Sequence, residues 1–317
     1  MRQPVIATVT LNPAIDHLVT LAGLREGEIN RAEEAYVFPG GKGVNVSIIL
    51  NRLGTATEAF GFLAGDTGKA YEAMLGRYGV PCRFSWLEHG FTRINTKVTA
   101  DSETEINGNG PVIRMEDLDR LAAKLQSLRP GDYLVLSGNV PKGLEGAYSY
   151  LVSKLRSAKL CIAADTTGKE LMGLLSCRPF LIKPNLKELE ELCGISVRNA
   201  EDLKACIRRL RRAGAENILV SMGAEGAVLF TAGGQVFKAD GISGTVCNTV
   251  GAGDSMLAGF LAGWTAEHNW QKALETGAAA GTATAFAFGL AEADGIRAVR
   301  PFVTVRDCSF EFPGLFA

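Results

Sequence analysis

The 317-residue sequence predicts an α/β fold, in which a mostly parallel β-sheet carries helices on both faces and a small second β-layer projects from it. Short runs of β-branched residues alternate along the chain with segments of helical periodicity, which is the order found in parallel sheets. Several of these runs are apolar at nearly every position, as strands covered on both faces are. Two other segments alternate apolar and polar residues, which is typical of strands that expose one face.

The first elements are two strand–helix pairs. Val5–Leu11 is predicted as a strand, and Val44–Leu53 as a helix that follows a glycine-rich turn. Glu58–Leu63 is predicted as the next strand, and Lys69–Tyr78 as the helix after it. This βαβα order indicates that the strands lie parallel in one sheet.

The second part of the chain continues the pattern. Five further strands are predicted: Tyr133–Ser137, Leu160–Asp165, Phe180–Lys183, Asn217–Ser221 and Ala227–Thr231. The most apolar stretch of the chain is Thr276–Ala291. It is short for a membrane span and consists mostly of Ala, Gly and Thr, which indicates a packed helix of a soluble protein.

The projecting β-layer is predicted from residues 14–38 and 84–106. In the second of these segments, apolar side chains fall on one side of a strand and polar side chains on the other. We therefore expect a single domain over residues 1–317, with these two segments as inserted lid strands. Such a layer is typical of a lid or of a dimer contact.

The composition excludes several classes of protein. The 33 basic and 34 acidic residues nearly cancel, so no global field favours nucleic acid or a membrane, and an anionic substrate needs local basic groups. The seven cysteines form no C-x-x-C pair and the three histidines lack metal-ligand spacing, so neither a disulfide framework nor a zinc site is expected. Because the N-terminus lacks the pattern of a signal peptide, the expected location is the cytoplasm.

The most informative motif is Asn248–Met256, which reads Asn-Thr-Val-Gly-Ala-Gly-Asp-Ser-Met. Gly251, Ala252 and Gly253 form a turn that opens a helix, where unpaired amide groups and the helix dipole attract a phosphate. A carboxylate beside a phosphate is unfavourable unless it acts as the base for an attacking hydroxyl, and Asp254 is placed for this role. Helix capping by Asp254 is the alternative.

A second glycine-rich turn, Pro39–Asn45, also precedes a helix. Gly40 and Gly41 allow a ligand to approach the backbone closely, and the Asn45 amide can both donate to and accept from hydroxyl groups. The spacing of a Walker phosphate loop is absent. A plain strand–helix turn is the alternative.

Two further groups suit a phosphorylated sugar. Asp16 follows the first strand, and ligands of doubly wound sheets bind beyond the carboxyl ends of strands, where a carboxylate can accept hydrogen bonds from sugar hydroxyls. Arg93 and Lys97 share one face of a predicted strand with Asn95, and both cations can bind phosphate. The alternatives are a turn aspartate and a solvated strand face.

Two loops are candidates for contact with a nucleotide. Asn185 and Glu188 lie three residues apart after Lys183 has left a strand, and this spacing favours a capping box. The alternative is that Glu188 holds a Mg²⁺-bound water near nucleotide phosphates. Ser221–Ala227 is a glycine-rich turn between two strands, which suits either a hairpin or a loop that faces the nucleotide.

In this order and spacing, the motifs resemble those of the ribokinase-like carbohydrate kinases, in their phosphofructokinase B branch. Gly40–Asn45 is similar to the first signature of the family, and Asn248–Asp254 is similar to the second. Thr8–Asp16 and Thr92–Asn95 are similar to the opening and lid of the bacterial 1-phosphofructokinases. The resemblance covers Val5 to Ala285 and implies a ribokinase-like three-layer α/β/α sandwich with a small projecting β-sheet lid.

The resemblance implies an ATP-dependent kinase that phosphorylates fructose 1-phosphate at the 6-hydroxyl to give fructose 1,6-bisphosphate, with Mg²⁺ as a cofactor. Kinases of tagatose 6-phosphate or fructose 6-phosphate are the alternatives within the same fold. The alternative of another class is a non-catalytic regulator that binds a sugar phosphate, although a pure binder has no use for a base beside an anion hole. No nucleic acid or membrane is an implied partner, and the β-lid is the expected contact of a homodimer.

The resemblance also implies a role for each matching residue. Asp254 is the implied catalytic base, and the amides of Gly251, Ala252 and Gly253 form the implied anion hole. The residues implied to bind the sugar phosphate are Asp16, Gly40, Gly41, Lys42, Asn45, Arg93, Ser137 and Asn139, with Lys42 near the phosphate that Arg93 holds. The residues implied to face ATP are Lys183, Asn185, Glu188, Ser221, Gly223, Ala224, Glu225 and Gly226, and Glu188 is the implied contact of Mg²⁺ through water. Asn139 stands where many relatives have serine, which concerns the hydroxyl preference of the site.

Overall fold

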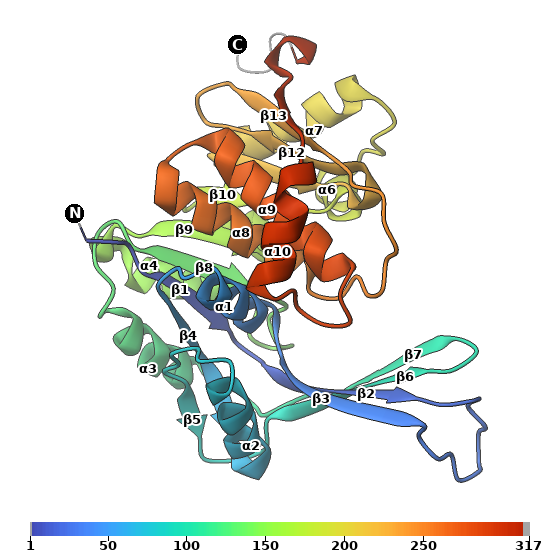
Figure 1. The fold of residues 1–317 in the computed structure, drawn as a ribbon. Helices are drawn as coiled ribbons and strands as arrows, with labels where there is room; N and C mark the ends of the chain where they lie inside the picture. The colour runs from blue at the N-terminus through green and yellow to red at the C-terminus, as the bar shows by residue number, and fades with distance from the viewer. Residues whose placement is uncertain (1, 313–317) are drawn as a thin grey trace.

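The computed structural model describes residues 2–312, which form two β-sheets and the helices packed on them (Figure 1). The large sheet has ten strands in the order β14-β13-β12-β11-β10-β9-β8-β1-β4-β5. Their bounds are β1 Ile6–Thr10, β4 Thr57–Ala64, β5 Ser85–Leu87, β8 Tyr133–Ser137, β9 Cys161–Asp165, β10 Leu181–Ile182, β11 Asn217–Ser221, β12 Gly226–Phe230, β13 Val236–Asp240 and β14 Val305–Asp307. Neighbours from β5 to β11 pair in parallel, and only β12, β13 and β14 at one edge pair antiparallel. The predicted mostly parallel sheet is confirmed.

Helices cover both faces of the large sheet, as predicted (Figure 1). One face carries α1 (Lys42–Arg52), α2 (Gly65–Gly76), α8 (Ala252–Glu267), α9 (Trp270–Ala285) and α10 (Ala293–Val299). The other face carries α3 (Met115–Leu125), α4 (Ala147–Lys154), α5 (Gly168–Leu175), α6 (Leu186–Cys193) and α7 (Ala200–Ala213). Along β1, Ile6 packs into the first layer and Ala7 and Val9 pack into the second, so the strand must be apolar on both sides.

The strands predicted from the sequence begin and end within one residue of the observed strands. Helix ends are less well predicted. The helix α2 begins at Gly65, four residues before the predicted start, and no capping side chain marks its N-terminus. The apolar stretch Thr276–Ala291 lies partly in α9 and continues beyond its end.

The small sheet projects from the body of the molecule (Figure 1). Its strands are ordered β3-β2-β6-β7, with bounds β2 Ala14–Thr20, β3 Glu34–Gly40, β6 Arg93–Thr99 and β7 Glu103–Asn107. The projecting β-layer is therefore confirmed, but one part of the predicted segment 84–106 lies elsewhere. Ser85–Leu87 forms β5 at the edge of the large sheet, because Phe84 and Leu87 are buried against the body and draw this short stretch beside β4.

Two structural findings bear on the predictions from composition. Each of the seven cysteines is free. Between residues 2 and 312, the structure contains no helix with the length and apolar character that a membrane crossing requires.

Candidate active site

A cavity of about 940 Å³ opens at the carboxyl ends of the parallel strands, between the large sheet and the small sheet. Its wall contains residues at or just beyond the ends of β1, β8, β9, β10 and β11, together with the first turn of α8. Ligands of doubly wound sheets bind at this edge. All of the site residues implied by the resemblance line this cavity except Gly40 and Glu225.

Asp254 is the third residue of α8 and is only 6% exposed at the wall of the cavity. Gly251 caps this helix with φ at 79°, a left-handed conformation that glycine adopts without strain. The side-chain amide of Asn45 donates to Oδ2 of Asp254 at 2.8 Å and thereby links the two glycine-rich turns. Asp254 therefore contacts another side chain of the site in addition to standing at the helix start.

Burial raises the pKa of Asp254 to about 6, and repulsion from Asp165 adds to this rise. The hydrogen bond from Asn45 and the charges of Lys42 and Lys183 act in the opposite direction. A carboxyl group with its pKa near neutrality can both accept a proton and release it again. The electrostatics therefore suit a general base.

The first turn of α8 faces a lysine. A Cβ atom added to Gly253 would lie 3.2 Å from Nζ of Lys183, so the ammonium group lies close to this turn. One of the three amides in the expected anion hole already has a partner within the protein, because the amide of Ala252 donates to the carbonyl of Thr249 at 3.2 Å. Attraction of an anion to this position thus combines the dipole of α8 with the charge of Lys183.

Asp165 is a site residue that the sequence reasoning missed. It ends β9, lines the cavity, and pairs through Oδ1 with Nζ of Lys183 at 3.4 Å while both side chains are buried. Its position at the end of an all-apolar strand is the signal that could have identified it, as it did for Asp16.

Lys42 lies among carboxylates. Asp165 is the largest cause that raises the pKa of Lys42, with smaller contributions from Asp254 and Glu188, while burial lowers it. From the sequence, Lys42 was expected near the sugar phosphate with Arg93. In the structure Lys42 and Arg93 line the same cavity, and the charges that raise the pKa of Lys42 are those of carboxylates at the end of β9, the start of α8 and the first turn of α6.

Several buried polar atoms at the cavity have no hydrogen-bond partner within residues 2–312. They are Asn12 Oδ1, Asn95 Oδ1, Ser137 Oγ and Asp165 Oδ2, and each of these residues lines the cavity. Buried polar atoms in native proteins are nearly always paired. Such a group of unpaired atoms around one cavity indicates that a polar ligand supplies the partners.

Asp16 points from the lid strand β2 into this cavity. Asn95, opposite it on β6, donates to Oδ1 of Asp16 at 3.0 Å. Burial raises the pKa of Asp16, against the hydrogen bond from Asn95 and the charges of Lys97 and Arg93. Gly40 has a supporting role here, because a Cβ atom at this position would lie 2.1 Å from Oδ2 of Asp16.

The guanidinium of Arg93 is held at the edge of the cavity by two backbone carbonyls. Its Nε donates to Asn12 at 3.2 Å and its Nη1 to Gly108 at 3.4 Å. Lys97 is engaged instead with Glu105 of β7, with its Nζ 3.1 Å from Oε1. The predicted polar face of β6 therefore divides into a cavity-lining arginine and a surface ion pair.

The loop after β10 forms the predicted capping box. The amide of Glu188 donates to Oδ1 of Asn185 at 2.8 Å, and the amide of Asn185 donates to Oε2 of Glu188 at 2.9 Å, which completes a capping box. Both residues also line the cavity, so the cap and the expected nucleotide contact are compatible.

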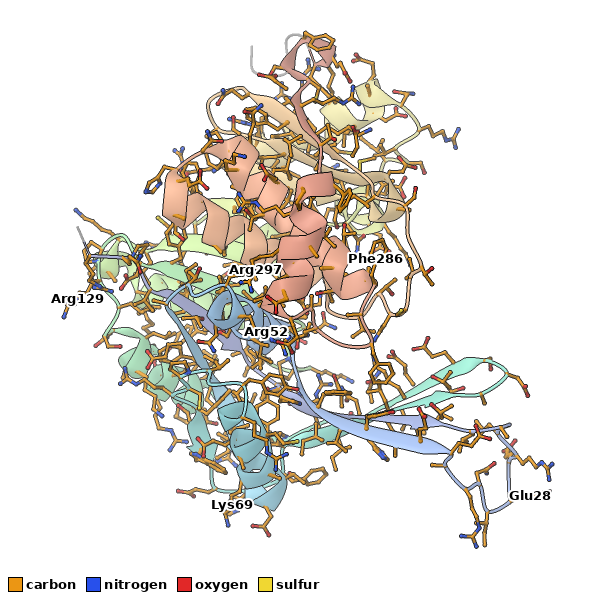
Figure 2. All side chains as sticks on the ribbon, viewed as in Figure 1. Glu28, Arg52, Lys69, Arg129, Phe286 and Arg297 are labelled. Atoms are coloured by element: carbon orange, nitrogen blue, oxygen red, sulfur yellow. The ribbon has the colours of Figure 1, made fainter. Side chains whose placement is uncertain are left out.

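The far wall of the cavity was predicted only in part. Ser221, Gly223, Ala224 and Gly226 line it as expected, whereas Glu225 lines a smaller neighbouring cavity. The sequence reasoning missed the remaining wall, which consists of Asp240, Gly241, Ile242, Ser243, Gly244, Val246, Ala278, Gly281, Thr282, Ala285 and Phe286. Phe286 follows the last residue of α9 and is labelled in Figure 2. The small residues of α9 had been interpreted as packing positions only.

The chain is similar to known proteins in both sequence and fold. Residues 9–294 match the model of the pfkB family carbohydrate kinases. The chain is 38% identical to a 1-phosphofructokinase of Bacillus subtilis over 95% of this chain and 99% of the relative, and 35% identical to a D-tagatose-1-phosphate kinase of Bacillus licheniformis over 90% and 94%. The structure of phosphofructokinase-2 from Escherichia coli in complex with fructose-6-phosphate has the same fold, with a TM-score of 0.86 at 23% identity over 94% of this chain and 98% of that chain.

Proposed function

The chain belongs to the pfkB family of carbohydrate kinases, and we propose that it transfers the γ-phosphoryl group of ATP to the 6-hydroxyl of fructose 1-phosphate, giving fructose 1,6-bisphosphate. The family assignment makes it a sugar phosphotransferase with ATP as the donor. The substrate is proposed from the relatives named 1-phosphofructokinase, which are 38% and 37% identical over 95% of the chain, and from a cavity with an arginine on its lid side.

The position of Asp254 carries the mechanism. Its buried carboxylate stands at the start of α8, where it can accept the proton of an attacking hydroxyl as that oxygen approaches a phosphoryl group. Asn45 holds Oδ2 by its hydrogen bond and leaves Oδ1 for the hydroxyl. A base placed in this way contributes on the order of 10²–10⁴ in rate.

Charge neutralisation at the transferred group would come from the α8 turn and two lysines. Phosphoryl transfer needs alignment and stabilisation of negative charge on the equatorial oxygens. Lys183 lies beside Gly253, and Lys42 lines the same cavity, so we expect both cations to act on the donor phosphates. Each well-placed donor of this kind is worth on the order of 10²–10³ in rate.

The sugar would occupy the lid side of the cavity. Asp16 and Asn95 are joined by a hydrogen bond and present further oxygen and nitrogen atoms to sugar hydroxyls. Arg93 would bind the phosphate already on the sugar, because its planar fork matches phosphate oxygens and its attachment to two carbonyls reduces its freedom.

The donor set also fits Mg²⁺. Mg²⁺ keeps several waters and takes only one or two carboxylates together with substrate phosphates. Asp165, with its unpaired Oδ2, and Glu188 both line the cavity, and residues 2–312 contain no cluster of three or more ligating side chains that would form a dedicated metal cage. Asp165 and Glu188 would therefore hold Mg²⁺ through waters, and the ion would neutralise charge on the ATP phosphates.

A second candidate substrate is a tagatose phosphate. The relative from Bacillus licheniformis carries the name D-tagatose-1-phosphate kinase at 35% identity. Asn139 lines the cavity just after Ser137, the last residue of β8, and its amide can both donate to and accept from a sugar hydroxyl. Fructose and tagatose differ at one stereocentre, which a single misplaced hydrogen bond can discriminate.

The test is to identify the product. Purified protein is incubated with ATP, Mg²⁺ and fructose 1-phosphate, and the phosphorus and carbon NMR spectra of the sugar are recorded. We expect a new phosphate ester on carbon 6 and stoichiometric ADP. A sugar spectrum that stays unchanged while the protein remains folded would exclude this kinase activity and favour the sugar-phosphate-binding regulator.

The proposed homodimer would form through the outer face of the small sheet. Val37, Ile94 and Ile106 lie on the face opposite Asp16 and Asn95, and they are 51%, 42% and 63% exposed. An apolar sheet face left uncovered by the same chain is typical of a subunit contact. The proposed compartment is the cytoplasm, where free cysteines such as these stay reduced.

A further inference from the structure

Two buried tyrosines hold the backbone of the turns that form the sugar side of the cavity. Tyr71 on α2 donates from its hydroxyl to the carbonyl of Gly40 at 2.9 Å. Tyr148 on α4 donates to the carbonyls of Ser137 at 2.9 Å and Gly138 at 3.3 Å. Both tyrosine side chains are fully buried and neither lines the cavity, so a substrate would not touch them.

The turn held by Tyr71 determines where Asp16 rests. Gly40 ends β3, and its backbone leaves so little room that an added Cβ atom would lie 2.1 Å from Oδ2 of Asp16. The next residue, Gly41, lines the cavity and is the N-cap of α1, which carries Asn45. A shift of the Gly40 carbonyl would therefore move the contacts on which Asp16 and the start of α1 depend.

The turn held by Tyr148 presents the groups that follow β8. Gly138 has φ at 99°, its amide donates to the carbonyl of Asp165 at 3.1 Å, and its carbonyl also accepts from Thr166 Oγ1 at 3.0 Å. On either side of it, Ser137 and Asn139 line the cavity. The hydrogen bonds donated by the Tyr148 hydroxyl therefore help to fix these two residues relative to the sheet.

Both hydroxyl groups remain donors at neutral pH. Burial raises the pKa of Tyr71 well above its usual value, and the neighbouring Asp16 raises it further. Burial likewise raises the pKa of Tyr148, with smaller contributions from Glu170 and Asp165. Without the Tyr71 hydroxyl the Gly40 carbonyl loses a buried donor, and without the Tyr148 hydroxyl the Ser137 carbonyl loses one, while the Gly138 carbonyl keeps Thr166 Oγ1. The loss of a buried hydrogen bond is unfavourable unless the turn moves.

We propose that Tyr71 and Tyr148 are positioning residues, whose hydroxyl groups set the geometry of the sugar-phosphate side of the site without contact with the substrate. This inference rests on the proposed function of that site. The aromatic rings fill the core and would still do so in phenylalanine, so the role belongs to the hydroxyls alone. Removal of either hydroxyl should loosen one turn and should weaken binding of the sugar phosphate more than binding of ATP.

The chain offers a matched control on the same strand as one of the two turns. Tyr133 begins β8, at the end away from Ser137, and is also buried. Its hydroxyl accepts from Nε1 of Trp264 at 2.9 Å and does not line the cavity. Tyr133→Phe therefore removes one hydrogen-bonded hydroxyl from the same protein core without freeing a turn of the site.

The test compares Tyr71→Phe, Tyr148→Phe and Tyr133→Phe with the wild type in steady-state kinetics and in amide hydrogen exchange without substrate. For the first two variants we expect KM for the sugar phosphate to rise about tenfold while KM for ATP changes less than about twofold. We also expect faster exchange in the peptides that cover residues 40–46 and 137–140, respectively. For Tyr133→Phe, both KM values and the exchange of these peptides should match the wild type.

Each outcome decides the proposal. If the wild type is an active kinase and the first two variants behave like Tyr133→Phe, the positioning role is excluded while the proposed function stands. If the wild type phosphorylates no sugar phosphate, the proposed function fails, and the exchange measurement still decides the role of the hydroxyls because it needs no substrate. Equal increases in both KM values would also exclude a role specific to the sugar side.

Discussion

Asp254 obeys a local rule of helix structure and also has the features that its proposed chemical role requires. An acidic residue in the first turn of a helix is favoured by the helix dipole, which is why capping was a reasonable alternative from sequence. In the structure this carboxyl is buried, has a raised pKa and accepts a hydrogen bond from Asn45, a residue 209 positions away. These features exceed what a cap requires and agree with a general base.

Replacement of the base tests this assignment. Asp254→Asn should lower kcat by at least about a hundredfold with little change in either KM, because the amide cannot accept the proton. Because the pKa of Asp254 is raised to about 6 in the folded protein, ionisation of this carboxyl destabilises the fold, and the whole of this cost is present above about pH 6. At pH 8 the variant should therefore melt at the same temperature as the wild type or higher, as measured by calorimetry. Asp66→Asn, whose side chain is 96% exposed, is the control. A kcat for Asp254→Asn within tenfold of the wild type contradicts the assignment.

The pH dependence follows from the same pKa. The base acts only when ionised, so kcat/KM should be constant above about pH 7 and should fall tenfold per unit as the pH drops below about 6. Because sugar phosphates titrate in the same range, the ionisation of Asp254 is also measured without substrate, from the pH dependence of its carboxyl carbon NMR signal. That signal is assigned as the one that is missing from the spectrum of Asp254→Asn. A signal that titrates near pH 4 would show that Asp254 is not perturbed as described.

At the scale of the element, the strand β6 turns one face toward the cavity and leaves the other face exposed. Period-two spacing correctly placed Arg93 and Asn95 on one side, because strand geometry follows from alternation alone. Ion pairing across strands could not be predicted, since the register that brings Lys97 to Glu105 depends on the turn after β6.

Removal of the arginine tests the binding face. Arg93→Ala should raise KM for the phosphorylated sugar about 10- to 100-fold, because a charge-assisted hydrogen bond to the phosphate is lost. KM for ATP should stay nearly unchanged. The control is Arg129→Ala, an exposed arginine on the opposite side of the molecule from the lid (Figure 2). A similar rise in both KM values for Arg93→Ala argues against a clamp for the sugar phosphate.

The accuracy of the sequence predictions varied with the kind of element. Buried strands such as Tyr133–Ser137 were predicted to the residue, because burial on both faces requires an unbroken apolar run. The strands β13 and β14 at the antiparallel end of the sheet were missed, since Val236–Asp240 and Val305–Asp307 mix charged with apolar residues. The wall formed by α9 was missed for another reason: in sequence, the small residues of a helix have the same pattern whether they face a neighbouring helix or a ligand.

For the whole molecule, the cavity draws its residues from both sheets and from nearly the full length of the chain, from Thr10 to Phe286. Motifs at the ends of strands could be assembled from the sequence, because the carboxyl ends of parallel strands meet at one edge. Distances across the cavity could not. The placement of Lys42 among carboxylates, and the pairing of Asp165 with Lys183, depend on how the strands are ordered in space.

The outer lid face leads to a prediction about assembly. The double variant Val37→Asp with Ile106→Asp should be monomeric in light scattering after size exclusion, while the wild type is a dimer, because buried like charges would oppose the contact. Val112→Asp is the control, since Val112 is 80% exposed but lies outside both sheets. A wild-type protein that is monomeric at all concentrations contradicts a lid-mediated dimer.

The central claim is that the cavity phosphorylates fructose 1-phosphate through Asp254. The most direct measurement is kcat/KM, from ADP release, for fructose 1-phosphate, fructose 6-phosphate, tagatose 1-phosphate and tagatose 6-phosphate under identical conditions, with Asp254→Asn as the blank. We expect the highest kcat/KM for fructose 1-phosphate, at least about tenfold above each alternative, which corresponds to about 1.4 kcal/mol of transition-state binding. A higher value for any other sugar phosphate, or ADP release that persists in Asp254→Asn, would contradict it.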